Sequence, residues 1–169
     1  MLLFHIKFLK SKECVLDTRI IMKQPIRIIE PQTPKEFEAY FFLRYEVLRK
    51  PWNQPLGSEK DENENTSIHI MAIDENNSVL GVCRLQFNSH IEAQLRFMAV
   101  KKDSQGLGIG RRLIEYAELK AQNEGASSMI LQARENAIDF YKKCNYSLKE
   151  KSFLMWNQIQ HYLMIKEFK

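Results

Sequence analysis

The chain lacks the features that define several protein classes, beginning with cysteine. Its three cysteines, Cys14, Cys83 and Cys144, lie far apart and form no C-x-x-C pair. Neither a disulfide framework nor a zinc site is predicted from this pattern. A reducing, cytoplasmic setting is the simplest interpretation, and we expect no metal in the functional site.

Long apolar runs and a strong net charge are also missing. No apolar stretch is long enough to span a membrane, and the first ten residues lack the basic region and cleavage site of a signal peptide. The net charge is only +4, and Lys and Arg are dispersed among acidic residues. We therefore expect neither a membrane nor a nucleic acid as partner.

The length and composition favour one globular domain. The chain has 169 residues, of which 44% are hydrophobic and 27% charged, so it can bury a substantial core. The first convincing strand begins after residue 23. We predict a single domain over residues 24–169, preceded by an extension over residues 1–23 of uncertain structure.

The most informative segment joins an apolar strand to an amphipathic helix through three alternating glycines, Gly106, Gly108 and Gly110. Glycine has no Cβ, so a ligand can approach the backbone closely. Outward-pointing N–H groups at the start of a helix form an anion site. Arg111 and Arg112 place positive charge at the end of the helix where the dipole disfavours it, and a bound anion would offset that cost. We infer a phosphate or pyrophosphate site.

Other interpretations of the glycine turn fit less well. A turn that serves only packing would not explain why the strand, the glycines and the arginines all favour an anion site. The G-x-G-x-G spacing differs from the G-x-G-x-x-G of a dinucleotide-binding turn, and the strand after the helix does not end in Asp or Glu. No G-K-S/T sequence is present for a P-loop.

Hydrophobic periodicity predicts an α+β fold with a mixed, mostly antiparallel sheet flanked by helices. Thr33 and Glu36 form a capping-box pattern around Pro34, at the start of a helix that runs to about Arg49. Further helices are expected over residues 108–124 and 136–144, and strands over residues 26–30, 67–74, 79–87, 92–100, 129–133, 146–153 and 161–168.

Two motifs resemble those of a known family. Residues 105–111 read Q-G-L-G-I-G-R and match the Q/R-x-x-G-x-G/A segment of the GNAT superfamily of N-acetyltransferases. Residues 136–146 resemble its second signature, with Asn145-Tyr146 where Gly-Phe is usual. Asn tolerates positive φ, so the turn can survive the exchange. The resemblance implies a GNAT-like fold and a bacterial, acetyl-CoA-dependent N-acetyltransferase.

The resemblance also implies roles for particular residues. Acetyl-CoA would place its pyrophosphate on the glycine turn, and its pantetheine arm would lie along a strand end where a bulge near Met98 opens the sheet. Tyr141 aligns with the family's general acid. Asn136 either caps the helix that carries Tyr141 or contacts the cofactor. The expected cofactor-binding residues are Met98, Ala99, Val100, Gln105, Gly106, Leu107, Gly108, Ile109, Gly110, Arg111 and Asn136.

The general base and the acceptor remain open in the sequence. Glu46, His69 and His161 are candidates for the base, with His161 favoured because the family's last strands flank the acceptor cleft; deprotonation through water is the alternative. The loop over residues 50–65 carries four acidic side chains. It is either a solvated surface loop or an acceptor-side loop that favours a cationic amine.

Two further expectations follow from the resemblance. The acceptor is expected to be a small-molecule or peptide amine that attacks the thioester of acetyl-CoA directly in a ternary complex. The exposed last strands suggest a homodimer. The alternative function is a catalytically silent module that binds acetyl-CoA as a sensor or interaction partner.

Overall fold

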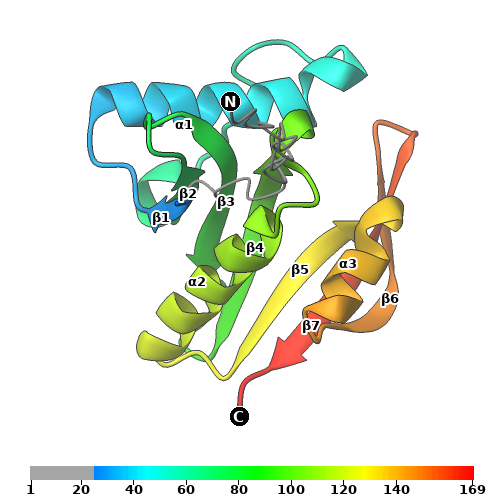
Figure 1. Ribbon diagram of the computed structural model, residues 1–169. Coiled ribbons are helices and arrows are strands. Elements are labelled where there is room, and N and C mark those ends of the chain that lie inside the picture. The colour runs from blue at the N-terminus through cyan, green and yellow to red at the C-terminus, as the bar shows by residue number, and fades with distance from the viewer. Residues whose placement is uncertain (1–24) are drawn as a thin grey trace, which may run out of the picture.

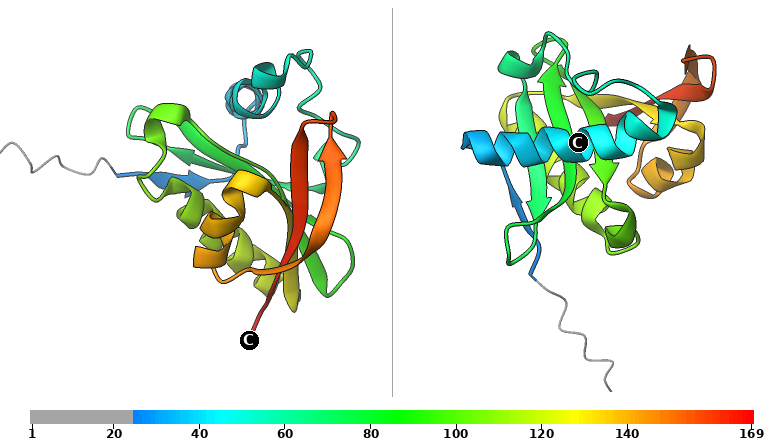
Figure 2. Two further views of the ribbon diagram at one scale, coloured as in Figure 1. Left: turned by 90° about the vertical axis from the view of Figure 1, so that its right-hand side faces the viewer. Right: turned by 90° about the horizontal axis from the view of Figure 1, so that it is seen from above.

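The computed structural model describes residues 25–169, which form a seven-stranded sheet with helices on both faces (Figures 1 and 2). The predicted extension over residues 1–23 lies outside the described residues. The strand order is β1-β2-β3-β4-β5-β7-β6, and every neighbouring pair is antiparallel except β4 and β5. The α+β prediction is confirmed.

The elements are β1 (Arg27–Ile29), α1 (Pro34–Leu48), β2 (Ile68–Ile73), β3 (Val79–Phe87), β4 (Glu92–Val100), α2 (Ile109–Asn123), β5 (Ser128–Arg134), α3 (Ile138–Lys143), β6 (Ser147–Met155) and β7 (Ile159–Glu167), with short 3-10 turns at Lys50–Trp52, Glu64–Thr66, Lys102–Ser104 and Glu135–Ala137.

Helix α1 covers one face of the sheet, as the end-on view of this helix shows (Figure 2, left). The predicted capping box is present: the Glu36 amide donates to the Thr33 hydroxyl at 3.3 Å, and the Thr33 amide donates to the Glu36 carboxylate at 2.9 Å. The apolar cluster under α1 consists of Tyr40, Leu43, Leu48, Met71, Ile73, Val82 and Ala99.

Helices α2 and α3 cover the opposite face, over the larger part of the core. The predicted apolar stripe of α2, formed by Ile109, Leu113, Ala117 and Ala121, is fully buried there. Asn145 adopts a φ of 69°, so the turn after α3 keeps the left-handed conformation expected of the family's glycine. The sheet is thus a central layer between two cores.

Two buried arginines tie the acidic loop to this layered structure. Arg44 on α1 and Arg84 on β3 have no exposed surface. Arg44 makes a two-pronged ion pair with Glu64, with both N–O distances at 2.9 Å. Arg84 donates to the same carboxylate at 2.7 Å and to Asp61 Oδ2 at 2.9 Å. Carboxylates held this way compensate buried charge.

The hypothesis that the loop acids attract a cationic amine is therefore wrong for these residues. Asp61 and Glu64 already face buried guanidinium groups, and Glu59 is itself buried, with its carboxylate accepting from the Gly57 amide at 2.8 Å. Only Glu62 on this loop projects an exposed carboxylate. The acids stabilise the fold rather than forming an acceptor surface.

The ion-pair arrangement predicts a large loss of stability for Glu64→Ala, because two buried guanidinium groups would lose their shared carboxylate. We expect the free energy of unfolding to fall by about 3–5 kcal/mol, measured by urea denaturation. Glu62→Ala, on the same loop but exposed, should change it by no more than about 0.5 kcal/mol. Equal unfolding curves for the two variants would contradict the assigned role.

Candidate active site

The pairing of β4 with β5 stops halfway along the two strands. It runs only from Glu92 opposite Ser128 to Leu95 opposite Leu131. On its other side β4 contains one extra residue relative to β3 near Phe97, whose φ of 52° marks a bulge. The predicted bulge near Met98 is confirmed, and the carboxyl ends of the two strands separate beyond it.

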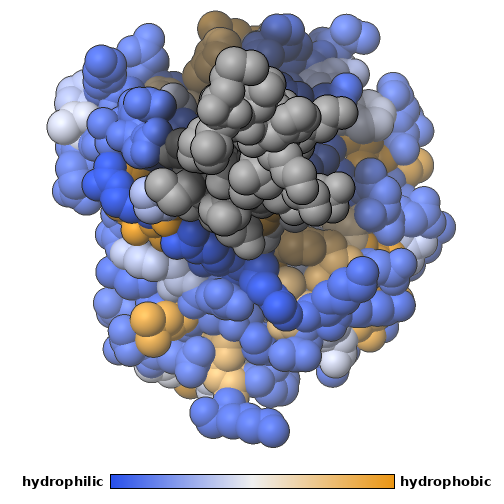
Figure 3. Space-filling view, viewed as in Figure 1, coloured by the Kyte–Doolittle hydropathy of each residue, from blue (hydrophilic) through white to orange (hydrophobic). Residues whose placement is uncertain are grey.

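A cavity of about 800 Å³ occupies this opening. Its lining comes from both faces of the sheet: Leu48 and Phe97 belong to the α1 side, and Ile109 and Tyr141 to the α2 side. In the space-filling view, hydrophobic residues show in the recess between β4 and β5, within a largely hydrophilic surface (Figure 3). The separation of the strands therefore brings residues from both faces of the sheet into one cavity.

At the α2 end of the cavity, the glycine turn exposes its backbone. Gly106 and Gly108 have φ values of 79° and 81°, and a Cβ built on either would meet no atom within 4 Å. Gly108 is the N-cap of α2. Side chains rarely adopt this backbone conformation, so glycine is required here. The result is an open cradle of N–H groups at a helix start, suited to an anion.

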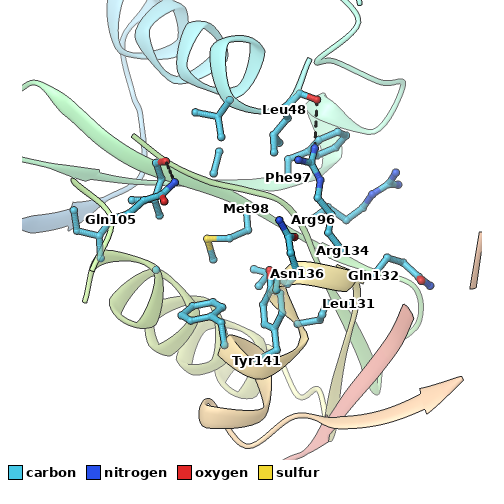
Figure 4. A pocket seen from close by; sticks show the side chains of 18 of the residues that line it. Leu48, Arg96, Phe97, Met98, Gln105, Leu131, Gln132, Arg134, Asn136 and Tyr141 are labelled. Atoms are coloured by element: carbon cyan, nitrogen blue, oxygen red, sulfur yellow. Dashed lines mark hydrogen bonds between the residues drawn. The ribbon is translucent and has the colours of Figure 1, made fainter. Parts of the chain in front are cut away.

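The adjoining end of β4 presents backbone groups that β5 does not pair. The Lys101 amide donates to Leu80 in β3 at 2.8 Å, so the peptide groups of Val100 face the other way, toward the opening left by β5. The side-chain amide of Gln105 donates to the Val100 carbonyl at 3.3 Å and joins the glycine turn to this strand end (Figure 4). An extended ligand can pair with β4 here as an added strand does.

The structure brings together most of the residues predicted to bind a cofactor. Leu107 is the exception: it is absent from the lining, and 52% of its surface is exposed. Asn136 lines the cavity, but it does not cap α3, whose N-cap is Ala137. The predicted residues that do line the cavity are Met98, Ala99, Val100, Gln105, Gly106, Gly108, Ile109, Gly110, Arg111 and Asn136.

Tyr141 lines the cavity from α3, on the α2 side of the sheet. Figure 4 shows Gln105 on one side of it and Gln132 on the other, with Met98 close by. The side chain is 7% exposed, and its ring packs edge-on against Tyr146 at a centroid distance of 6.0 Å. Burial raises the pKa of the Tyr141 hydroxyl above its usual range, so the group stays protonated.

His161 on β7 lines the cavity on the side away from the glycine turn, directly opposite Arg134 on β5. Its ring stacks on Phe153 with centroids 4.5 Å apart, and its Nδ1 lies 3.0 Å from the Ile159 carbonyl. A carbonyl only accepts, so the hydrogen is on Nδ1 and the lone pair on Nε2. Burial lowers the pKa of His161, and the nearby Arg134 lowers it further, against the opposing effect of the Ile159 bond.

The other two candidates for the base do not reach the cavity. Glu46 is on the outer side of α1 and pairs with Lys50 at 2.7 Å. His69 is buried against α1, with ring centroids 5.3 Å from Phe37 and 5.1 Å from Tyr40. Neither residue is part of the lining, so only His161 of the three is in position.

Sequence reasoning missed the polar residues at the α1 end of the cavity. Arg49, Arg96, Gln132 and Arg134 all line it. A signal was available, since Gln132 and Arg134 alternate with the buried Leu131 and Ala133 near the end of a core strand. Polar side chains that share a face at a strand end are typical of a site.

No group of three or more His, Cys, Asp or Glu side chains within residues 25–169 is placed to hold a metal ion. None of the helices formed by these residues combines the length and apolar character needed to cross a membrane.

Comparisons with known proteins agree with this arrangement. The model of the acetyltransferase (GNAT) family matches residues 30–146. An uncharacterised N-acetyltransferase of Bacillus subtilis, YjcF, is 33% identical over 143 residues, which cover 84% of this chain and all of that protein.

Solved structures share the fold at lower identity. An acyl-CoA N-acyltransferase from Pseudomonas aeruginosa superposes with a TM-score of 0.71 at 21% identity, covering 85% of this chain and 99% of that one. A GNAT family acetyltransferase from Elizabethkingia anophelis with acetyl-CoA bound gives a TM-score of 0.66 at 15% identity, covering 85% and 98% of the two chains.

Proposed function

The chain belongs to the acetyltransferase (GNAT) family, and we propose that it transfers the acetyl group of acetyl-CoA to a primary amine by direct attack within a ternary complex. The observation that carries the proposal is the passage between β4 and β5. It runs from the glycine turn, past Tyr141, to His161, so two substrates can approach the same point from opposite faces of the sheet.

The residues present fit acetyl-CoA. The N–H groups of the turn around Gly106 and Gly108 would hold the pyrophosphate, with Arg111 beside them. The backbone of Met98 and Val100, left without a β5 partner, would pair with the pantetheine amides. When bound, acetyl-CoA supplies an acetyl group activated as a thioester.

Tyr141 and His161 have complementary properties for the proton transfers. The Tyr141 hydroxyl keeps its proton because burial raises its pKa, and it can donate that proton to a departing thiolate. His161 is held neutral with its lone pair on Nε2, so it can take a proton from the attacking amine, directly or through water. Two titratable groups with pKa values displaced in opposite directions are typical of an acid and base pair.

The first test is ligand binding followed by turnover. Acetyl-CoA at about 100 times its Kd should add about 2.7 kcal/mol to the stability of the folded state, visible as a rise in melting temperature, whereas NADH should give none. Thiol release should then appear with at least one amine in a broad panel. Absence of an acetyl-CoA shift would contradict the proposal at its first step.

Gly108→Ala tests the anion cradle. Forcing a side chain into a positive φ should cost about 1–2 kcal/mol of stability, and displaced N–H groups should weaken acetyl-CoA binding about tenfold. Gly57→Ala is the matched control, because Gly57 also has a positive φ, of 98°, and open surroundings but lies outside the cavity. Both variants should lose stability in thermal melts, and only Gly108→Ala should lose affinity in calorimetry.

Tyr141→Phe removes the proposed proton donor and keeps the ring. We expect kcat to fall by about 100-fold or more, with an unchanged Kd for acetyl-CoA. Tyr146→Phe is the control, because this neighbouring tyrosine is also buried but does not line the cavity. Full turnover by Tyr141→Phe would exclude the hydroxyl as the acid.

His161→Gln tests the base through the pH dependence of kcat/KM. Only neutral His161 can accept a proton, so wild-type kcat/KM should fall as the pH drops through a pKa below the usual 6.5. The variant should lose about 100-fold or more in kcat/KM together with this acidic limb. His69→Gln, a buried histidine outside the cavity whose pKa is also lowered, should keep the wild-type profile. If His161→Gln kept the acidic limb of the kcat/KM profile, another group would have to be the base.

A further inference from the structure

The α1 end of the cavity carries positive charge that carboxylates among residues 25–169 balance only in part. Arg49, Arg96 and Arg134 line this end. They come from three different elements: the end of α1, the bulged part of β4 and the last position of β5. Figure 4 shows Arg96 and Arg134 on the side of the cavity away from Gln105, which marks the glycine turn.

The bonds that these arginines make are mostly to neutral groups. Arg49 donates from Nε to the Ser58 carbonyl at 2.8 Å and from Nη1 to the Leu48 carbonyl at 3.2 Å. Arg134 donates to the same Leu48 carbonyl at a long 3.4 Å. Its guanidinium lies 5.9 Å from the Trp52 ring centroid. Carbonyls and rings satisfy part of a guanidinium but leave its charge uncompensated.

The nearby carboxylates are already committed to other groups. Glu64 is shared by the buried Arg44 and Arg84, and Asp61 forms a two-pronged pair with Arg84. Arg96 reaches Asp61 only at 3.6 Å. Glu59 acts on Arg49 from a distance while its carboxylate accepts from the Gly57 amide. Within residues 25–169, Arg134 forms no ion pair with a carboxylate.

The guanidinium groups also repel one another. The pKa of Arg49 is lowered by burial first and then by Arg44, Arg134 and Arg96, with Glu59 opposing. Burial lowers the pKa of Arg134 as well. On the same cavity wall, the side-chain oxygen of Gln132 is buried and has no partner among the described residues. Such a wall is stabilised by whatever brings negative charge and a hydrogen-bond donor to it.

We propose that the acceptor carries an oxyanion group, a carboxylate or a phosphate, on the same molecule as its amine, and that Arg49, Arg96 and Arg134 bind this group. The inference rests on the proposed function. Arg134 stands opposite His161 in the β5–β7 pair, so an oxyanion held there lies beside the residue proposed to deprotonate the amine. Guanidinium groups match carboxylate and phosphate oxygens in pairs.

The arginine cluster formed by Arg49, Arg96 and Arg134 is not placed to bind the phosphates of acetyl-CoA. The glycine turn that fits them opens on the α2 side of the sheet, whereas Leu48, Phe97 and the arginines near them lie on the α1 side. The cavity thus has one anion-binding end on each side of the sheet, with Tyr141 on the α2 side and His161 next to Arg134.

Matched acceptors test the inference through kcat/KM. A free α-amino acid should be preferred over its amide, and phosphoethanolamine over ethanolamine, in at least one of the two pairs by about tenfold or more; which pair responds distinguishes carboxylate from phosphate. The amide has the less basic amine, so a preference for the acid cannot come from a larger neutral fraction. Acetylation with no preference for the member that carries the carboxylate or phosphate would overturn this inference and leave the proposed function standing.

Arg134→Gln and Arg96→Gln should remove most of that preference by lowering kcat/KM for the acceptor that carries the oxyanion while sparing the acceptor that lacks it. Arg27→Gln, an exposed arginine on β1 that bonds Asn77, is the control and should keep the preference. A uniform loss for both members of a pair would show a structural effect and contradict the assigned binding role. No acetylation of any amine would instead contradict the proposed function.

A binding readout separates the two proposals further. With the chain saturated in CoA, inorganic phosphate or acetate should raise the melting temperature of the wild type and of Arg27→Gln, and raise that of Arg134→Gln much less. Equal shifts in all three with both anions would refute the cluster as an anion site, whatever the turnover assays show.

Discussion

The site depends on one interruption of a hydrogen-bonded ladder. Strand β4 stays paired with β3 along its length but leaves β5 after Leu95, and the extra residue at Phe97 makes the change of direction. A phenylalanine at positive φ is strained, so surrounding contacts must hold it. Arg44 stacks on the Phe97 ring with its guanidinium carbon 3.7 Å from the centroid, and Arg84 lies at 4.8 Å. The buried ion pairs that fasten the acidic loop therefore also brace the bulge that opens the cavity.

The two faces of the sheet contribute different kinds of groups to that opening. On the α2 face, backbone N–H groups and a free strand edge suit a long, phosphorylated cosubstrate, and they do so with few side chains. On the α1 face, Arg49, Arg96, Arg134 and Gln132 line the cavity with polar side chains, which are the groups proposed to bind the acceptor. The reaction proposed for the protein takes place where the two halves meet, beside Tyr141.

Burial acts on the two proposed catalytic groups in opposite senses because their charged forms have opposite signs. Loss of water disfavours the tyrosinate, which keeps Tyr141 protonated, and disfavours the imidazolium, which keeps His161 neutral. The uncompensated arginines reinforce the second effect. A single low-dielectric cavity can thus prepare an acid and a base at the same pH. An oxyanion that arrives with the acceptor would raise the pKa of His161 as it binds.

The sequence by itself determined the order of the elements, the capping box of α1, the glycine turn and the buried stripe of α2, because these follow from local periodicity, φ preferences and motif spacing. The bulge near Met98 and the interest in Tyr141 and His161 came from the resemblance to the GNAT superfamily. Only the tertiary structure decided that Glu46 and His69 lie outside the cavity. It also decided that Arg44 and Arg84 form ion pairs with Asp61 and Glu64 of the acidic loop. It alone brought Arg49, Arg96 and Arg134 to one wall. Those residues are 38 to 85 positions apart in the chain; charge compensation between such distant groups depends on which strands become neighbours, and no local pattern encodes that.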